Sequence, residues 1–298
     1  MKQNRSGFVT LVGRPNAGKS TLLNRFIGEK VAIVTDKPQT TRNRIYGIYT
    51  DKNRQLIFVD TPGIHRPRHK LGAYMIKVAQ RALTGVDAIL HVVDGRAALG
   101  PGDRYIADSL SQLRIPILLA VNKIDALNRE QILMALEGYS HLANYKEIVP
   151  ISALKGRNVS LLLDLITGYL PPGPRLYPDH MITDLPERFA ISELIREQVL
   201  HLTWDEVPHS VAVLVQDMIE REDRGLLYIR ALILVERESQ KGIIIGRKGR
   251  RLKVVGQRAR LEIEELLGRG VYLDLWVKVR EGWRDHAGAL HELGYSDS

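Results

Sequence analysis

The chain of 298 residues contains no cysteine. Disulfide scaffolds, thiolate metal sites and cysteine nucleophiles are therefore excluded, and the absence is typical of proteins from a reducing compartment. Aromatic residues make up only 6% of the chain, and no apolar run approaches the roughly 20 residues needed to span a bilayer. Met1–Ser6 is short and polar and lacks the apolar core of a signal peptide. These absences favour a cytoplasmic protein.

Acidic residues are in deficit, with 34 Asp and Glu against 43 Lys and Arg, which gives a formal net charge of +9. Such an excess favours a polyanionic partner, either nucleic acid or an anionic membrane surface. The hydrophobic fraction of 44% excludes disorder as a description of the whole chain. At about 100–200 residues per domain, the length suits two domains.

Short apolar runs alternate with longer helical stretches in the first half of the chain. The runs are Phe8–Val12, Leu56–Val59, Ala88–Val93, Ile117–Val121 and Ile148–Ile151. Strands that are apolar on both faces are typical of a parallel sheet covered by helices. We therefore expect residues 1–172 to form a doubly wound, mostly parallel α/β domain, with ligands bound beyond the C-terminal ends of its strands.

The pattern changes after a proline-rich stretch. Residues 173–185 are predicted to form a stiff linker, because proline denies both helix and ladder hydrogen bonds; an internal surface loop is the alternative. Residues 186–298 predict a smaller α+β domain with a C-terminal tail. Its expected elements are a helix over 186–202, strands over 210–220 and 226–236, a helix over 250–267 and a strand over 271–280.

A glycine-rich motif, G-x-x-x-x-G-K-S, follows the first predicted strand and precedes a helix. Its residues are Gly13, Arg14, Pro15, Asn16, Ala17, Gly18, Lys19 and Ser20, with Thr21 next in the helix. This is the context of a P-loop, in which backbone N–H groups and a helix N-terminus surround phosphates. We expect Lys19 to bridge the β- and γ-phosphates and the Ser20 hydroxyl to ligate Mg²⁺.

A second motif, D-x-x-G, follows the Leu56–Val59 run as Asp60, Thr61, Pro62 and Gly63. Asp60 there can hold Mg²⁺ through a water, and the Gly63 N–H can sense a γ-phosphate. By itself the motif often marks a simple turn. Its position after a P-loop, at the end of a strand, indicates a nucleotide site.

Two further motifs point to guanine. In Asn122-Lys123-Ile124-Asp125, the Asp125 carboxylate can accept both adjacent donors of guanine, a pair that adenine lacks. We expect Asn122 to bridge structure near the base and the Lys123 stem to cover its face; a helix N-cap is the alternative. Ser152, Ala153 and Leu154 follow the next strand, and the Ala153 N–H could donate to guanine O6.

In this order, G-R-P-N-A-G-K-S, D-T-P-G, N-K-I-D and S-A-L resemble the motifs of the translation-factor-type GTPases. Between the first two lies a segment that resembles the family's first switch: Gln39, Thr40, Thr41, Arg42 and Asn43. The resemblance implies that Thr41, rather than Thr40, ligates Mg²⁺ when GTP is bound, so Lys19, Thr41 and Gly63 are the expected catalytic residues. An exposed polar loop is the other interpretation.

The chain departs from many GTPases after D-x-x-G. It has Ile64 where a glutamine often orients the attacking water. We therefore expect slow intrinsic hydrolysis that a partner stimulates; His65 is a weaker candidate for a base. Asn16 resembles the residue that recruits K⁺ in cation-stimulated GTPases, which makes K⁺ a candidate cofactor.

The second half carries a G-x-x-G motif before its long helix. We expect RNA contacts from this motif and the basic residues that follow: Gly246, Arg247, Lys248, Gly249, Arg250, Arg251 and Lys253. Eight basic and no acidic residues lie between Lys241 and Arg260, as expected of a phosphate-binding surface. The motif and the strand order resemble a type II KH domain. Tyr272, Trp276 and Trp283 could stack on bases or simply fill a core.

A GTPase domain followed by a KH domain resembles the Era family of bacterial GTPases over nearly the whole chain. The resemblance implies GTP hydrolysis, binding to the 3′ end region of 16S ribosomal RNA, and action in assembly of the 30S subunit. It also implies GTP or GDP with Mg²⁺ as ligands and a monomeric protein. Two alternatives stay open: a GTPase at the inner face of the cell membrane, and a weakly catalytic assembly factor that nucleotide merely stabilises.

Overall fold

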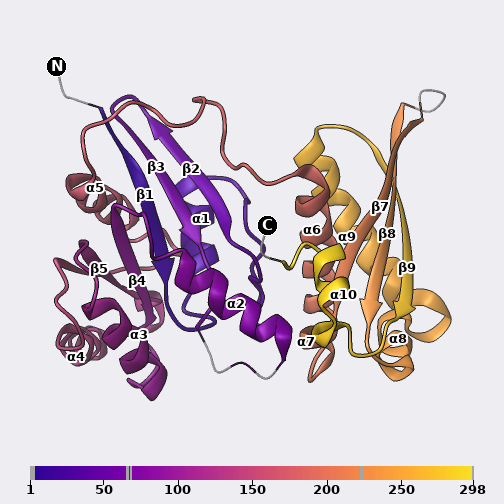
Figure 1. The fold of residues 1–298 in the computed structure, drawn as a ribbon, viewed down its shortest axis with the longest axis horizontal. Helices are drawn as coiled ribbons and strands as arrows, with labels where there is room; N and C mark the ends of the chain where they lie inside the picture. Colours follow the sequence, from indigo (N-terminus) through magenta and orange to yellow (C-terminus); the bar gives the residue numbers. More distant parts are fainter. Residues whose placement is uncertain (1–3, 65–66, 68, 222–224, 297–298) are drawn as a thin grey trace. The chain divides into compact units, whose positions relative to one another are not determined.

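The computed structural model describes residues 4–64, 67, 69–221 and 225–296, and they form two compact units (Figure 1). Asp184 is the last residue of the first unit, and Leu185 begins the main segment of the second. Within the described ranges, no helix is both long enough and apolar enough to cross a membrane.

The first unit is a six-stranded sheet flanked by helices, in the order β2-β3-β1-β4-β5-β6. Its strands are β1 (Arg5–Val12), β2 (Ile45–Asp51), β3 (Arg54–Asp60), β4 (Ala88–Asp94), β5 (Ile117–Asn122) and β6 (Glu147–Pro150). Its helices are α1 (Lys19–Ile27), α2 (Lys70–Arg81), α3 (Pro101–Ser111), α4 (Arg129–Ser140) and α5 (Val159–Tyr169). The expected doubly wound, mostly parallel fold is confirmed.

Strand β2 is the element that the apolar runs did not predict. It lies at one edge and pairs antiparallel with β3 alone. An edge strand is not buried on both faces, so Tyr46 and Tyr49 are only half-buried and Gly47 interrupts the apolar pattern. Strand β2 therefore does not form a run that is apolar on both faces.

Helices pack on both faces of this sheet. On one face α3 and α4 pack against Val12, Ile89 and Val93. On the other, Phe26 of α1 stacks on Phe58 of β3, with ring centroids 4.4 Å apart. Because β1, β3, β4, β5 and β6 run parallel, the loops after their C-terminal ends meet at one edge, and all four motifs lie in those loops.

Residues 173–184, predicted as most of a stiff linker, are fastened to the first unit. The Gly173 N–H donates to Asn4 O (3.0 Å), and the Ile48 N–H of β2 donates to Ile182 O (2.8 Å). The fully buried Gln55 side chain accepts from the N–H groups of Leu176 (2.7 Å) and Tyr177 (2.9 Å). The proline-rich sequence therefore covers the edge of the sheet, and the boundary between the units falls at 184/185.

The second unit is a three-stranded sheet with helices on one face. Its elements are α6 (Glu187–His201), α7 (Val207–Ser210), β7 (Ala212–Arg221), β8 (Leu226–Val235), α8 (Glu238–Ile245), α9 (Arg250–Leu267), β9 (Val271–Val279) and α10 (Ala287–Glu292). Strand β8 is central, antiparallel to β7 and parallel to β9. Ile229, Ala231 and Ile233 of β8 are fully buried beneath the helices, and the expected type II KH arrangement is confirmed.

Candidate nucleotide and RNA sites

The P-loop joins β1 to α1 and leaves the start of the helix open. Gly18 is the N-cap of α1, and no side chain of the described residues caps the helix there. The first-turn N–H groups are therefore available to an anion, with the positive end of the helix dipole behind them. Lys19 is buried, and its Nζ donates to the carbonyl oxygens of Gly13 and Arg14, both at 3.1 Å. Burial lowers the Lys19 pKa, and the charge of Asp60 opposes that shift.

Three oxygen ligands meet beside this helix start. The Ser20 hydroxyl donates to Asp60 Oδ2 (2.6 Å) and lies 3.0 Å from the Thr41 hydroxyl, which is 3.4 Å from the same carboxylate oxygen. Asp60 is fully buried, which raises its pKa, while Lys19 works in the opposite direction. Its Oδ1 has no hydrogen-bond partner among the described residues. Hydroxyl and carboxylate oxygens around a buried, unsatisfied carboxylate fit the ligand preference of Mg²⁺.

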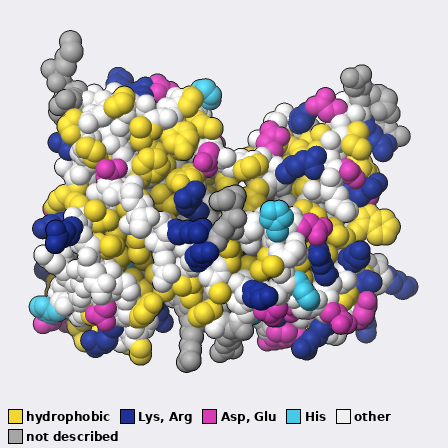
Figure 2. Space-filling view, in the orientation of Figure 1, with side chains coloured by type: hydrophobic (Ala, Val, Ile, Leu, Met, Phe, Trp, Pro, Cys, Tyr) yellow, Lys and Arg dark blue, Asp and Glu magenta, His cyan; other side chains and the backbone are white. Residues whose placement is uncertain are grey.

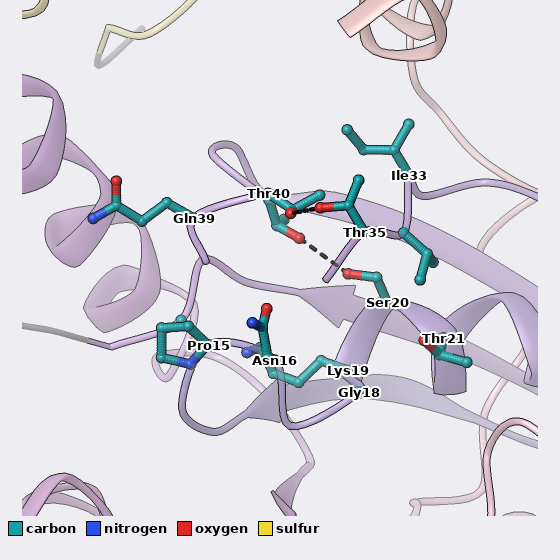
Figure 3. Close-up of a pocket in the computed structure, with 13 residues that line it drawn as sticks. Pro15, Asn16, Gly18, Lys19, Ser20, Thr21, Ile33, Thr35, Gln39 and Thr40 are labelled. Carbon is teal, nitrogen blue, oxygen red and sulfur yellow. Dashed lines mark hydrogen bonds between the residues drawn. The ribbon is translucent and has the colours of Figure 1, made fainter. Parts of the chain in front are cut away.

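The two neighbouring threonines of the predicted switch face different partners. Thr41 turns to Ser20 and Asp60. Thr40 is bonded to the Thr35 hydroxyl (2.7 Å) and to Lys37 O (2.7 Å), as Figure 3 shows for the Thr35–Thr40 pair. Gln39, with Thr40 and Thr41, lines the pocket that lies over Lys19 and Ser20.

The other two residues of the predicted switch do not line that pocket. Arg42 is buried, and Asn43 accepts a hydrogen bond from the Tyr74 hydroxyl of α2 (2.7 Å).

The D-x-x-G loop passes directly against the P-loop. Thr61 is anchored through its hydroxyl to Leu11 O (2.9 Å), and Pro62 is buried. A Cβ on Gly63 would lie 2.6 Å from the backbone nitrogen of Pro15, so only glycine fits this close approach. Ile64 packs against a hydrophobic cluster that includes Val12. His65 lies outside the described residues.

Asn122 joins three loops at the other end of the site. Its Nδ2 donates to Ala17 O (2.9 Å), and its Oδ1 accepts from the N–H groups of Lys123 (2.8 Å) and Ala153 (2.9 Å). The structure therefore engages the Ala153 N–H with Asn122 rather than leaving it directed at a ligand. Sequence reasoning missed this contact because side-chain capping of a distant loop has no local signal.

The Asp125 carboxylate is oriented from the fourth motif. The Ser152 hydroxyl donates to Asp125 Oδ1 (2.6 Å), while the Asp125 side chain itself is exposed. The Lys123 side chain reaches back to the P-loop, where its Nζ donates to Asn16 O (2.5 Å) and to Asp94 Oδ2 (2.7 Å). Burial acts to raise the Asp94 pKa, but the hydrogen bonds and charges of Arg96 and Lys123 outweigh it and lower the pKa to about 2. N-K-I-D, S-A-L and the P-loop thus form one connected edge.

Arg25 is a residue of this edge that no motif indicates. It lies on α1, and its Nε donates to Ala153 O (3.0 Å) while its Nη2 donates to Leu154 O. The helix that begins at the phosphate loop therefore also holds the S-A-L loop in place. Nothing in the sequence separates Arg25 from an ordinary exposed helix arginine.

In the second unit, the G-x-x-G segment forms a tight turn between α8 and α9. Gly246 has φ 70°, and a Cβ there would lie 2.8 Å from the Arg251 Cβ, so the position requires glycine. Arg251 reaches back over the turn to the Ile243 carbonyl. Arg247, Lys248, Arg250 and Lys253 are exposed.

A groove continues from this turn between α9 and β9. It is lined by Gly249, Leu252, Lys253, Gly256, Gln257, Arg260, Val271, Tyr272, Leu273 and Leu275. Its basic members come from α9, and its apolar floor comes from β9. Figure 2 shows Lys and Arg side chains gathered around the α8 region of this unit, with acidic side chains beside them. Positive charge beside an apolar groove suits a nucleic acid, whose phosphates and bases need both.

A P-loop, an oxygen-lined metal position and a guanine-type carboxylate define the first unit as a GTPase domain, and the second unit is a KH domain. Family models agree with both: "50S ribosome-binding GTPase" matches residues 8–123, and "KH domain" matches residues 206–284.

The chain belongs to the GTPase Era family. It is 54% identical over 291 residues to GTPase Era of Alkaliphilus oremlandii (strain OhILAs), covering 98% of this chain and 99% of the relative. A solved structure of Era in complex with MgGDPNP and nucleotides 1506–1542 of 16S ribosomal RNA matches with TM-score 0.95 and 42% identity, over 99% of this chain and all of the other. An Aquifex aeolicus Era variant bound to GDP and AlF₄⁻ matches with TM-score 0.94 and 42% identity, over 98% of this chain and all of the other.

Proposed function

We propose that this protein binds GTP with Mg²⁺ at the edge formed by the four motifs, hydrolyses it, and binds the 3′ end region of 16S ribosomal RNA during assembly of the 30S subunit. The observation that carries the nucleotide half is the meeting of Ser20, Thr41 and Asp60 beside the open start of α1. The similarity to Era in complex with 16S nucleotides 1506–1542 supports the RNA half.

Each residue of the site has a definite part in this proposal. Lys19 and the first-turn N–H groups of α1 neutralise phosphate charge, and Gly63 approaches the γ-phosphate because its loop lies against Pro15. Ser20, Thr41 and Asp60 would hold Mg²⁺, which when bound would supply positive charge to the phosphates. Asp125, oriented by Ser152, accepts from guanine, and the Lys123 stem covers the base.

Slow intrinsic hydrolysis follows from Ile64, which packs into a hydrophobic cluster and cannot orient a water. We expect RNA or a ribosomal partner to accelerate the reaction. Asn16 is the proposed K⁺ residue, and its Nδ2 already bonds Asp36 O (2.7 Å). Hydrolysis measured in KCl and in NaCl at equal ionic strength tests this point, and equal rates would remove K⁺ from the proposal.

The decisive experiment uses the full chain. RNA with the sequence of 16S nucleotides 1506–1542 is titrated against wild type and against the Gly246→Asp variant, with GDP and with a non-hydrolysable GTP analogue. We expect wild type to bind, with affinity that differs between nucleotides, and Gly246→Asp to lose RNA but keep nucleotide. Gly242→Ala is the matched control, because Gly242 lies in α8 with open space around it. Absence of RNA binding by wild type would contradict the proposal.

Linkage gives this titration a second use. If GTP raises the affinity for RNA, RNA must raise the affinity for GTP by the same factor. Equal RNA affinities in the two nucleotide states would exclude coupling while leaving RNA binding intact.

We propose a cytoplasmic monomer. Vesicles of anionic lipid, added in competition with RNA, test a peripheral contact with the inner face of the membrane.

A further inference from the structure

Two aromatic side chains are exposed on the KH sheet, on the face turned away from α6 and α9. Tyr272 and Trp276 of β9 are 58% and 61% exposed. They alternate with Leu273 and Leu275, which face the helices. Because β9 is an edge strand, both rings are accessible from the face and from the side. Trp283, in contrast, is fully buried and belongs to the core.

The rings are held in fixed positions. Tyr272 stacks on Tyr228 of β8, with centroids 5.8 Å apart and an interplanar angle of 14°. The Asp274 carboxylate, between the two exposed rings on β9, accepts from the Tyr228 hydroxyl (2.8 Å) and from Trp276 Nε1 (3.1 Å). An aromatic surface that is already ordered loses little conformational entropy when a ligand stacks on it.

Charged groups surround these rings. The Arg221 and Arg230 guanidinium carbons lie 4.9 Å and 5.8 Å from the Tyr228 ring centroid, and Lys278 is exposed on the same face of β9. The two carboxylates among the described residues of this face, Asp217 and Asp274, both have partners. Arg230 pairs with Asp217 (3.2 Å) and lies 3.9 Å from Asp274, which also accepts from the rings. Within the described part of this face, basic groups outnumber acidic ones, which favours an anionic ligand with flat, stackable groups.

The surface is continuous with the groove beside the G-x-x-G turn. Tyr272 lines that groove together with Lys253 and Arg260 of α9, and its ring also belongs to the outer face. A strand that leaves the groove across β9 therefore meets Tyr272 first and Trp276 next.

We propose that Tyr272 and Trp276 form a second RNA contact, on which unpaired bases stack after the strand leaves the groove, while the buried Tyr228 supports the Tyr272 ring. The proposal rests on the RNA binding proposed above for this domain. Stacking accepts any base, because every base has a π-face. The surface would therefore add affinity for a longer single strand without reading its sequence, and the groove would retain the sequence preference.

The test compares RNA length in two variants. Tyr272→Ala and Trp276→Ala are titrated with an RNA of about four nucleotides, the length that a KH clamp holds, and with RNAs extended at either end. We expect Trp276→Ala to weaken binding of an extended RNA by about tenfold and to leave the short RNA unchanged. Tyr272→Ala also removes part of the groove lining, so it should weaken both RNAs, and the extended one more. Trp276→Phe, which keeps an aromatic face, should bind nearly as wild type, and thermal unfolding checks that each variant is folded.

Fluorescence gives an independent readout. Emission from Trp276, obtained as wild type minus Trp276→Phe to remove the exposed Trp204, should be quenched by extended RNA and not by short RNA. Unchanged affinity of both alanine variants for extended RNA, while Gly246→Asp abolishes binding, would overturn this proposal and leave the proposed function standing. A Trp276 response to anionic phosphatidylglycerol vesicles but not to RNA would overturn it too. If wild type binds no RNA, both proposals fail.

Discussion

The hydroxyl oxygens of Ser20 and Thr41 lie 3.0 Å apart, although one residue lies in the first turn of α1 and the other precedes the edge strand β2. Both also lie within 3.4 Å of Asp60 Oδ2. The switch segment is thereby attached to the metal position through one side chain. Thr40, the adjacent residue, is attached instead to Thr35.

Thr41→Ala should therefore raise the Mg²⁺ concentration needed for half-maximal GTP hydrolysis by roughly 10- to 100-fold, the range seen when the support of a metal site is removed. Thr40→Ala is the matched control and should change it little, because its hydroxyl bonds to Thr35 and Lys37 of the same loop. Hydrolysis rates at a series of Mg²⁺ concentrations measure both. A larger effect of Thr40→Ala than of Thr41→Ala would show that Thr40, and not Thr41, ligates the metal.

Arg25→Met should weaken GDP and GTP alike by about tenfold, because two hydrogen bonds that hold the S-A-L loop are lost, each worth about 0.5–1.5 kcal/mol. The turnover rate at saturating GTP should stay close to wild type, since Arg25 is bonded to the base end of the site. Arg25→Lys, which can keep one of the bonds, should fall between the two. Calorimetry with GDP and steady-state hydrolysis separate binding from turnover; a fall in turnover alone would contradict this role.

Asp125→Asn should reverse the preference of the base site. The amide presents a donor where the carboxylate accepts, so affinity for GDP should fall by about 100-fold or more while xanthosine diphosphate gains. Ser152→Ala, which removes the 2.6 Å bond to Asp125 Oδ1, should weaken GDP without favouring xanthine. Titrations with both diphosphates measure this change in base preference. An equal fall in affinity for both nucleotides would show that Asp125 does not read the base.

His91 makes stability depend on pH. Burial in β4 lowers its pKa from 6.5 to about 4, with Asp103 opposing and Lys19 adding to the shift. The folded state therefore binds fewer protons than the unfolded chain between these values, and the free energy of unfolding should fall as the pH drops from about 6.5 to about 4, by about 3 kcal/mol at most.

His91→Gln tests this dependence, because glutamine does not titrate and can still bond the Tyr145 hydroxyl, which lies 2.9 Å from His91 Nδ1. Denaturant unfolding across the same pH range should show a smaller slope in the variant, by up to one proton. Identical slopes would mean that other groups cause the acid sensitivity.

The sequence predicts the parts of this molecule whose physics is local. Parallel strands are apolar on both faces, so β1, β3, β4, β5 and β6 could be predicted from single runs. The motif glycines could also be predicted locally, because a close approach of backbone requires them, as it does at Gly63. Contacts between distant segments could not be predicted: Arg25 with Ala153, and Asn122 with the Ala153 N–H, join residues that only the fold brings together.

Gln55 shows what the proline-rich segment contributes. Its buried amide is satisfied by Leu176 and Tyr177, and residues 182–183 bond to the outer strand β2. A GTPase fragment that stops at residue 172 would lose the partners of this amide at residues 176 and 177 and bare a sheet edge prone to self-association. A fragment of the nucleotide half that ends after Asp184 would keep the segment that covers this edge of the sheet.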